Sequence, residues 1–278
     1  MARRQGGFSS QKRSKLVPDW LIYGVLLIIF VFTAYSVEQD IVIADVPDSP
    51  DLGPMLPSDS PRDEIVLVDV SAPESGMGTA FSINKDGLWL TARHVVDSCD
   101  SVGLRIGSGR VISVQSQIVQ NSDLAVLSSD WKRRPLPADL ESTRQIGEIG
   151  YFFGYPQGRA GEVVGSLIAR NRMKVRGRYT NEEAVLAWSE LGRSRKLKGS
   201  LGGLSGAPVL DKDGEIIGVI SAEAPRRGRI YSVAPRYLRG IITDPGTTTE
   251  PLSLETYGVA ADKLRRDRRV AQVICLVA

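Results

Sequence analysis

His94 is the strongest candidate for chemistry in this 278-residue chain, because the sequence contains no other histidine. Neutral imidazole is the only side chain whose unperturbed pKa lets it take up and return a proton near neutral pH, which makes it the usual general base. His94 lies in the string TARHVVD. A histidine without partners is equally well explained as a core or surface residue, so its role depends on what else the chain offers.

Two further residues complete a set that nucleophilic catalysis requires. Asp123 lies in NSDLAVLSS, at the start of a strand-like run, and Ser205 lies in GGLSGAPVLDKDGEIIGVIS. A nucleophilic serine needs a base to take its proton and an acid to hold that base in the right tautomer. Ser205, His94 and Asp123 can supply these three roles. Taken alone, Asp123 is also explained as a surface turn residue and Ser205 as a turn residue in a glycine-rich loop.

The glycines beside Ser205 indicate a second feature of the same site. A tight backbone at this point can aim the amide hydrogens of Gly203 and Ser205 at one position, where a negatively charged oxygen can form during the reaction. We therefore predict an oxyanion hole made of these two amides.

Composition excludes several other functions. The chain is 42% hydrophobic and 24% charged, which is typical of globular proteins. Its formal charge of +3 is small and no nucleic-acid-binding motif accompanies it, so we expect no nucleic-acid partner. The two cysteines, Cys99 and Cys275, lack metal-site spacing and there is no second histidine to complete such a site. We expect neither a metal nor a cofactor.

The N-terminal region predicts a membrane anchor. Residues 1–19 carry five basic side chains and lead into WLIYGVLLIIFVFTAYSV, residues 20–37, which is uncharged and just long enough to span a bilayer core of about 30 Å. Basic residues before this segment and acidic ones after it place residues 1–19 in the cytoplasm and the rest of the chain outside it. A cleaved signal peptide is the alternative, because Ala34 and Ser36 form a small-x-small site.

The rest of the chain is divided by composition. Residues 38–62 are acidic and contain five prolines, which predicts an extended linker. From residue 63 onward, short β-rich runs alternate with Gly, Asp and Ser, which is typical of an all-β sandwich or pair of barrels. The strings NKDG (84–87) and DKDG (211–214) predict turns between strands. Short helices are expected over 235–242 and 259–269.

Three strings in this order resemble a known family. GTAFSINKDGLWLTARHVVD, DLAVL and GGLSGAPVLDKDGEIIGVIS are similar to the trypsin-like (chymotrypsin-fold) serine proteases, and most similar to the bacterial envelope proteases of the HtrA type. The resemblance covers residues 63–244 and implies two packed six-stranded antiparallel β-barrels with the active site between them. It also implies His94 as general base, Asp123 as the residue that orients it, Ser205 as nucleophile, and the inner bacterial membrane and periplasm as location.

The chain departs from the family pattern beside the nucleophile. Leu204 stands where the envelope proteases usually have Asn and the digestive ones Asp, and Ala207 replaces a glycine. For the substrate pocket, the resemblance implies six residues with small or apolar side chains and no charge, and hence cleavage after small or medium apolar residues. These residues are Gly199, Ser200, Val219, Ile220, Ser221 and Ala222.

Residues 245–278 are expected to form a C-terminal tail, too short for the PDZ domain that many envelope proteases carry. We hypothesise a disulfide between Cys99 and Cys275, which would fasten this tail beside His94; two unrelated thiols are the alternative.

The sequence thus predicts a membrane-anchored serine endopeptidase that acts on protein or peptide substrates, with a homo-oligomer compatible with the family resemblance. A module of the same fold that binds or senses a partner, and stays inactive until that partner orders its oxyanion loop, is the alternative function.

Overall fold

The computed structural model of the chain describes residues 23–27, 41–43, 51–107, 109–194 and 196–278. Two compact units, residues 1–40 and 41–278, are described separately. In the first unit, residues 23–27 are helical, while the predicted cytoplasmic segment and the remainder of the predicted anchor at 20–37 lie outside the described residues. Across the described ranges, no helix combines the length and the apolar character needed to cross a bilayer.

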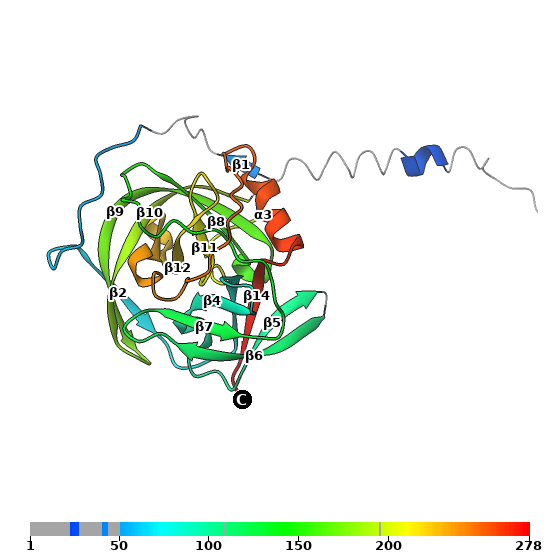
Figure 1. Ribbon diagram of the computed structural model, residues 1–278, viewed down its shortest axis with the longest axis horizontal. Helices are drawn as coiled ribbons and strands as arrows, with labels where there is room; N and C mark the ends of the chain where they lie inside the picture. The colour runs from blue at the N-terminus through cyan, green and yellow to red at the C-terminus, as the bar shows by residue number, and fades with distance from the viewer. Residues whose placement is uncertain (1–22, 28–40, 44–50, 108, 195) are drawn as a thin grey trace, which may run out of the picture. The chain divides into compact units, whose positions relative to one another are not determined.

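A closed barrel of six antiparallel strands confirms one of the two predicted barrels. In Figure 1 it forms the lower half of the second unit. Its strands are β3 (Gly76–Ser82), β4 (Leu88–Ala92), β5 (Ser101–Gly107), β6 (Arg110–Ile118), β7 (Leu124–Ser128) and β14 (Val270–Leu276), in the order β14-β3-β4-β7-β6-β5.

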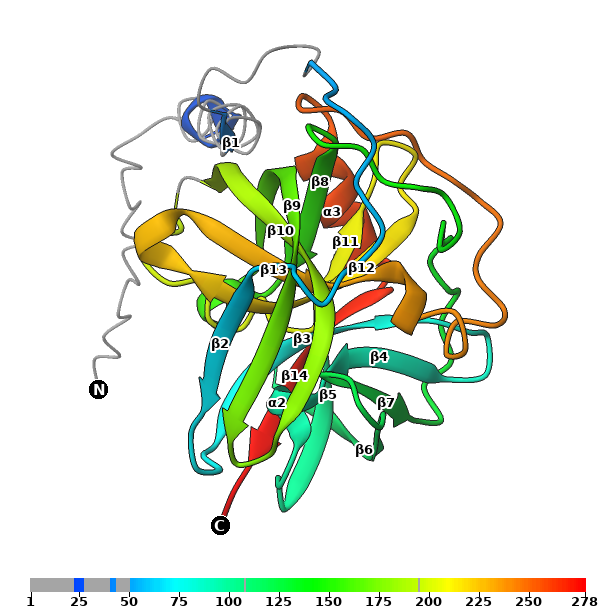
Figure 2. The ribbon, with the colours of Figure 1, turned by 90° about the vertical axis from the view of Figure 1, so that its left-hand side faces the viewer.

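The C-terminal segment, which sequence analysis places outside the protease domain, supplies the strand that closes this barrel. β14 pairs with both β3 and β5, and Figures 1 and 2 show it in red among strands from the first half of the chain. Val273 is fully buried in the barrel interior with Trp89 and Leu104. The residues around Val273 do not by themselves predict that β14 pairs with β3 and β5, because these partner strands lie far away in sequence.

The second group of strands is an eight-stranded sheet, and six of its strands close into the second antiparallel ring that the sequence predicts. Its strands are β1 (Ile41–Ile43), β2 (Ile65–Val70), β8 (Ile149–Gly154), β9 (Gly161–Gly177), β10 (Asn181–Ser194), β11 (Pro208–Leu210), β12 (Ile216–Ala224) and β13 (Arg229–Val233), in the order β1-β10-β13-β12-β11-β8-β9-β2, with β9 also paired to β10. Because β9 pairs with both β8 and β10, the six strands from β8 to β13 form the closed ring. Of the two added strands, β1 lies in the predicted linker and β2 lies at the start of the predicted protease domain.

Part of the predicted linker packs on this sheet rather than standing away from it. Leu56 is 4% exposed and belongs to the same apolar cluster as Phe152 and Trp188. The Gly53 and Leu56 amides donate hydrogen bonds to backbone carbonyls in residues 144–146, at 2.8 Å each. A buried apolar side chain and hydrogen bonds to residues 144–146 therefore hold this proline-rich segment against the sheet.

The turn predicted at residues 84–87 is formed, whereas only one of the two predicted helices is found as expected. In NKDG, the Asn84 side chain accepts the amides of Asp86 and Leu88 at 2.9 Å, and Gly87 takes the positive φ of +96° that this turn requires. The expected C-terminal helix is α3 (Tyr257–Arg266). The helix expected over 235–242 is instead the single 3₁₀ turn η4 (Pro235–Tyr237), and the glycine at 240 disfavours its extension.

Candidate active site

Pairing between strands brings His94 and Asp123 together. His94 lies in the short helix α2 (Arg93–Val96), directly after β4, and Asp123 directly precedes β7. β4 and β7 pair with Ala92 opposite Leu124, so the residues that follow one strand and precede the other are neighbours. The Asp123 carboxylate accepts the His94 backbone amide at 3.0 Å and contacts its ring Nδ1 at 2.8 Å.

Asp123 is almost fully buried, at 1% exposure, and accepts two further hydrogen bonds from the second sheet. The Tyr179 hydroxyl donates to it at 2.7 Å, and the Ser221 hydroxyl donates to the same oxygen that faces the ring. Burial raises the pKa of Asp123, but the charge of His94 and the hydrogen bonds that the carboxylate accepts lower it by more. Asp123 is therefore held as a carboxylate.

The same contact determines the state of the His94 ring. Burial lowers the pKa of His94, but the charge and hydrogen bond of Asp123 raise it by more, to above its ordinary value of 6.5. Because a carboxylate accepts at Nδ1, the neutral ring carries its proton there, and Nε2 is left as an acceptor. The side chain is 24% exposed, and His94 lines an open cleft.

Ser205 lies in that cleft, on the loop that leads into β11 of the second sheet. The cleft has a volume of about 550 Å³, and its lining includes His94, Gly203 and Ser205. The backbone carbonyl of Ser205 accepts the Thr79 amide at 2.8 Å, which ties the loop to β3 of the barrel. Among the described residues the Ser205 hydroxyl makes no hydrogen bond, so it is free to turn toward the ring, as is common in unliganded active sites.

The predicted oxyanion residues form a defined turn. The Leu204 amide donates to the Leu201 carbonyl at 2.8 Å and Gly203 has a φ of +95°, which are the features of a type II turn. The Gly202 carbonyl accepts the Gln157 amide at 2.5 Å. Because an N–H points opposite to the carbonyl of its own trans peptide, the Gly203 amide points away from Gln157. Among the described residues, neither the Gly203 nor the Ser205 amide donates a hydrogen bond, so both are available to an oxyanion.

Two residues that sequence analysis did not name hold this turn in place. Gln157 has a φ of +53°, and its side chain donates to the carbonyls of Lys198 and Ser200 at 2.6 and 2.7 Å. Glu223, on β12, accepts the Leu201 amide with both oxygens and the Ser200 hydroxyl with one. These contacts join residues more than 20 positions apart, so no local motif announces them.

Leu204, the main departure from the family pattern, is 1% exposed and packs in the apolar cluster of Phe152 and Trp188. A Cβ atom on Gly154 would lie 2.9 Å from its side chain, which shows how closely β8 approaches it. A buried apolar side chain thus stands beside Ser205, where the family resemblance predicts a polar or charged residue.

A second buried carboxyl group lies next to Asp123 and was also missed. Glu183, on β10, is 2% exposed and accepts the Asp123 amide at 2.7 Å, the Ser122 hydroxyl at 2.6 Å and the Asn181 side-chain amide at 2.8 Å. Burial and the nearby charge of Asp123 raise the pKa of Glu183 to about 8. It fixes the backbone of the turn that presents Asp123.

The six residues predicted for the substrate pocket are placed in different surroundings. Of these, Ser221 and Ala222 line the cleft, and the Ser221 hydroxyl is bound to Asp123. Val219 and Ile220 are buried in apolar clusters. Gly199 and Ser200 are exposed, and their polar atoms are engaged by Arg193 and Glu223.

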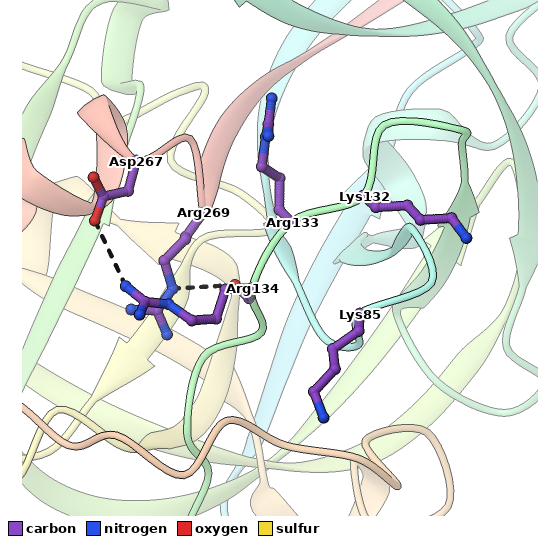
Figure 3. Close-up of a pocket in the computed structure, with 6 residues that line it drawn as sticks. All are labelled: Lys85, Lys132, Arg133, Arg134, Asp267 and Arg269. Atoms are coloured by element: carbon purple, nitrogen blue, oxygen red, sulfur yellow. Dashed lines mark hydrogen bonds and ion pairs between the residues drawn. The ribbon is translucent and has the colours of Figure 1, made fainter.

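Two clusters of charged side chains lie outside the cleft. Carboxylate oxygens of Asp139, Asp211 and Glu215 lie within 4.8 Å of one another, but the Arg144 guanidinium pairs with Asp139 and lies 3.6 Å from Asp211, so it fills the place of a cation. The second cluster is mainly basic. Figure 3 shows it as a pocket of about 620 Å³ lined by Lys85, Lys132, Arg133, Arg134, Asp267 and Arg269.

In the basic pocket, the side chains are directed to separate partners. The Arg269 guanidinium donates to the carbonyls of Arg134 and Pro135, which fixes the turn before β14, and Arg134 lies 4.0 Å from Asp267. In Figure 3 the two lysines and Arg133 extend away from this pair. None of these residues lines the cleft of His94.

Comparison with known proteins identifies the family. The family described as trypsin-like peptidase domain matches residues 78–219, which make up half of the chain. The chain belongs to this family. The match spans His94, Asp123 and Ser205, and relatives named as serine proteases and endoproteases confirm the predicted enzyme class.

Two curated relatives illustrate the similarity. The probable periplasmic serine endoprotease DegP-like of Hahella chejuensis is 26% identical over 161 residues, which cover 56% of this chain and 32% of the relative. Protease Do-like 1, chloroplastic, of Arabidopsis thaliana is 24% identical over 170 residues, 58% of this chain and 36% of the relative. The chain spans between 26% and 50% of the length of curated relatives that it matches.

Among solved structures, the active form of the Rv3671c protease from M. tuberculosis has a TM-score of 0.50 at 20% identity. The alignment covers 64% of this chain and 76% of that chain. This similarity supports the chymotrypsin-like fold.

Proposed function

We propose that this chain is a membrane-anchored serine endopeptidase that cleaves protein or peptide substrates outside the cytoplasm. The observation that carries the proposal is the buried Asp123 carboxylate 2.8 Å from the His94 ring, in a cleft that also contains Ser205 and the turn of Gly203. A carboxylate, an imidazole and a serine hydroxyl in this order are the components of covalent peptide hydrolysis.

In the proposed reaction, the Ser205 Oγ attacks the carbonyl carbon of the scissile bond while its proton passes to Nε2 of His94. The Gly203 and Ser205 amides bind the negatively charged oxygen. When the intermediate collapses, the C–N bond breaks and His94 returns the proton to the departing amine, which leaves an acyl group on Ser205. Water then attacks this ester by the same route, and the acid product is released.

Covalent labelling tests the proposal. A fluorophosphonate probe reacts with an activated serine, so the native protein should be labelled, Ser205→Ala should not, and Ser116→Ala, at an exposed serine of β6, should be labelled like the native protein. Absence of labelling in the native protein would favour the alternative function, a module that binds a partner before its oxyanion loop becomes competent.

Membrane anchoring and export form a separate part of the proposal. The uncharged segment at 20–37, with basic residues before it and acidic ones after it, supports both. Relatives named as periplasmic support export alone. The full chain should remain in the membrane pellet after an alkaline carbonate wash and be accessible to added protease only from the outer side. A released protein whose mass lacks about 36 residues would instead indicate a cleaved signal peptide.

A further inference from the structure

Strand β2 adds an element to the catalytic cleft that lies outside the family match at residues 78–219. It pairs in parallel with the far half of β9, from Ile65 opposite Arg172 to Val70 opposite Gly177. Val66, Val68 and Val70 pack against an apolar cluster of the second sheet. The strand is therefore a fixed part of the fold, and Figure 2 shows it beside β9.

One edge of β2 has no partner strand within the described part of the chain, because the sheet order ends there. The carbonyls of Glu64 and Val70 accept hydrogen bonds from Arg172 and Arg178, so the even-numbered residues direct their backbone groups toward β9. Backbone groups alternate along a strand. Leu67 and Asp69 therefore direct theirs to the open edge.

The end of β12 presents a second open edge. Residues 216–219 of β12 pair with β11, and Ile220 still exchanges hydrogen bonds with the nucleophile loop. Beyond it, Ala222, Glu223 and Ala224 pair with β13 on one side, and the described residues place no strand on the other.

Both open edges border the cleft that contains the nucleophile. Its lining includes Leu67 and Asp69 from β2, Ala222 and Glu223 from β12, and Ser205. Successive pairings make β12 and β2 run in opposite directions. A peptide that pairs antiparallel with β12 would therefore run parallel to β2, and both arrangements are regular ladders.

We propose that β2 supplies a second backbone edge for the substrate, so that a peptide paired with β12 on one side also forms hydrogen bonds with β2 on the other. This inference rests on the proposed endopeptidase function and adds a binding element to it, the backbone of Leu67 and Asp69.

N-methylation of the substrate tests this with the native enzyme. A strand paired on one edge uses the amides of alternate residues, whereas a strand paired on both edges uses the amide of every residue. In a cleavable peptide of about ten residues, methylation of either of two successive amides should lower kcat/KM about 3- to 10-fold, the effect of losing one hydrogen bond. Sensitivity at alternate positions alone would overturn the proposal.

Proline substitution tests the β2 edge itself. Leu67→Pro removes an amide from the open edge without removing a bond to β9, and should lower kcat/KM for the long peptide about 3- to 10-fold. Ile65→Pro is the matched control: Ile65 is on the same edge and 48% exposed, against 54% for Leu67, but does not line the cleft. It should cleave the peptide like the native enzyme.

Further measurements separate the possible causes of a loss. Leu67→Ala removes the same side chain and keeps the amide, so it measures the share of the side chain, and Leu67→Pro should lose about 3- to 10-fold more activity than Leu67→Ala. The rate of fluorophosphonate labelling should be the same in all three variants. An equal loss in Leu67→Ala or in Ile65→Pro, or no loss in Leu67→Pro, would overturn the proposal while labelling remains intact. Loss of labelling in the native enzyme would instead contradict the proposed function.

Discussion

The His94 ring has two edges, and the protein surrounds them differently. On the Nδ1 edge, the Asp123 carboxylate is 1% exposed and receives hydrogen bonds from Tyr179 and Ser221, on different elements of the second sheet. On the other edge, Ser205 lies in an open cleft beside a turn whose two inner amides have no partner among the described residues. The buried edge sets the protonation state of the ring, and the other edge belongs to the cleft in which we propose that the substrate binds.

Leu204 belongs to the support of the predicted oxyanion turn. Gln157 and Glu223 bind the backbone of this turn, and Leu204 packs in the apolar cluster. Glu223 lies at the wall of the cleft, whereas Gln157 and Leu204 do not line it. We therefore expect an oxyanion loop that is ready before substrate arrives.

The largest expected effect on kcat comes from removing the charge of Asp123, the carboxylate on the buried edge of the ring. Asp123→Asn should lower kcat about ten thousandfold, because an amide that donates toward Nδ1 favours the wrong tautomer of His94. Asp130→Asn, at an exposed position two residues beyond the far end of β7, is the control and should be fully active. Steady-state kinetics with a peptide substrate measures both, and a loss of less than tenfold in Asp123→Asn would contradict the assigned role.

The next effect concerns the support of the helix that carries His94. Cys99, just after α2, forms a disulfide with Cys275 on β14, with a Cα–Cα distance of 5.6 Å and a separation of 176 residues. Closing so long a loop restricts the unfolded chain, so Cys99→Ser should lower the free energy of unfolding by about 3 to 5 kcal/mol.

Denaturant unfolding of Cys99→Ser and of the reduced native protein should give the same loss. Alkylation followed by mass measurement provides the control for the bond itself. If both thiols of the unreduced native protein are alkylated, the disulfide is not formed in solution.

The open edge is expected to respond more moderately. Gly203→Ala places a Cβ 2.6 Å from the Tyr155 carbonyl at a φ of +95°, so the turn must shift and its amide must leave the oxyanion position. Loss of one oxyanion donor lowers kcat about 100- to 1000-fold. At Gly202 the nearest atom to an added Cβ is 3.5 Å away, so Gly202→Ala should lose little. Similar losses in the two variants would mean that Gly203 has no special part in the turn.

The comparison of the two edges also shows what sequence can reveal. His94, Asp123, Gly203 and Ser205 lie in short strings whose chemistry can be interpreted locally, and the structure brings them to one site. Glu183 stays hidden, because it reaches Asp123 across 60 residues and resembles any glutamate of a strand.

The same physical reason applies to the fold. Strand β14 and the extra strand β2 acquire their roles by pairing with distant strands. Hydrophobic pattern identifies a strand but does not identify its partner. For this reason a C-terminal tail was expected where the barrel has its closing strand.

The smallest effect on rate, and the most specific to the buried edge, is expected at Glu183. The folded protein holds a proton on Glu183 up to about pH 8, against an ordinary pKa of 4.5, so between these values it binds more protons than the unfolded chain. The stability that the folded protein gains from this bound proton is complete below about pH 4.5 and is lost as pH rises through 8. Glu183→Gln keeps acceptor and donor atoms in place and removes that loss.

Thermal unfolding from pH 5 to pH 9 should therefore show a smaller decline in Tm for Glu183→Gln than for the native protein. The matched control is Glu182→Gln, whose exposed carboxylate pairs with Arg172 and should leave the decline unchanged. Activity should rise with pH as His94 loses its proton, with a midpoint above 6.5, and kcat/KM of Glu183→Gln should stay within about tenfold of native. If Tm declines as steeply in Glu183→Gln as in the native protein, loss of the proton on Glu183 does not cause the fall in stability with pH.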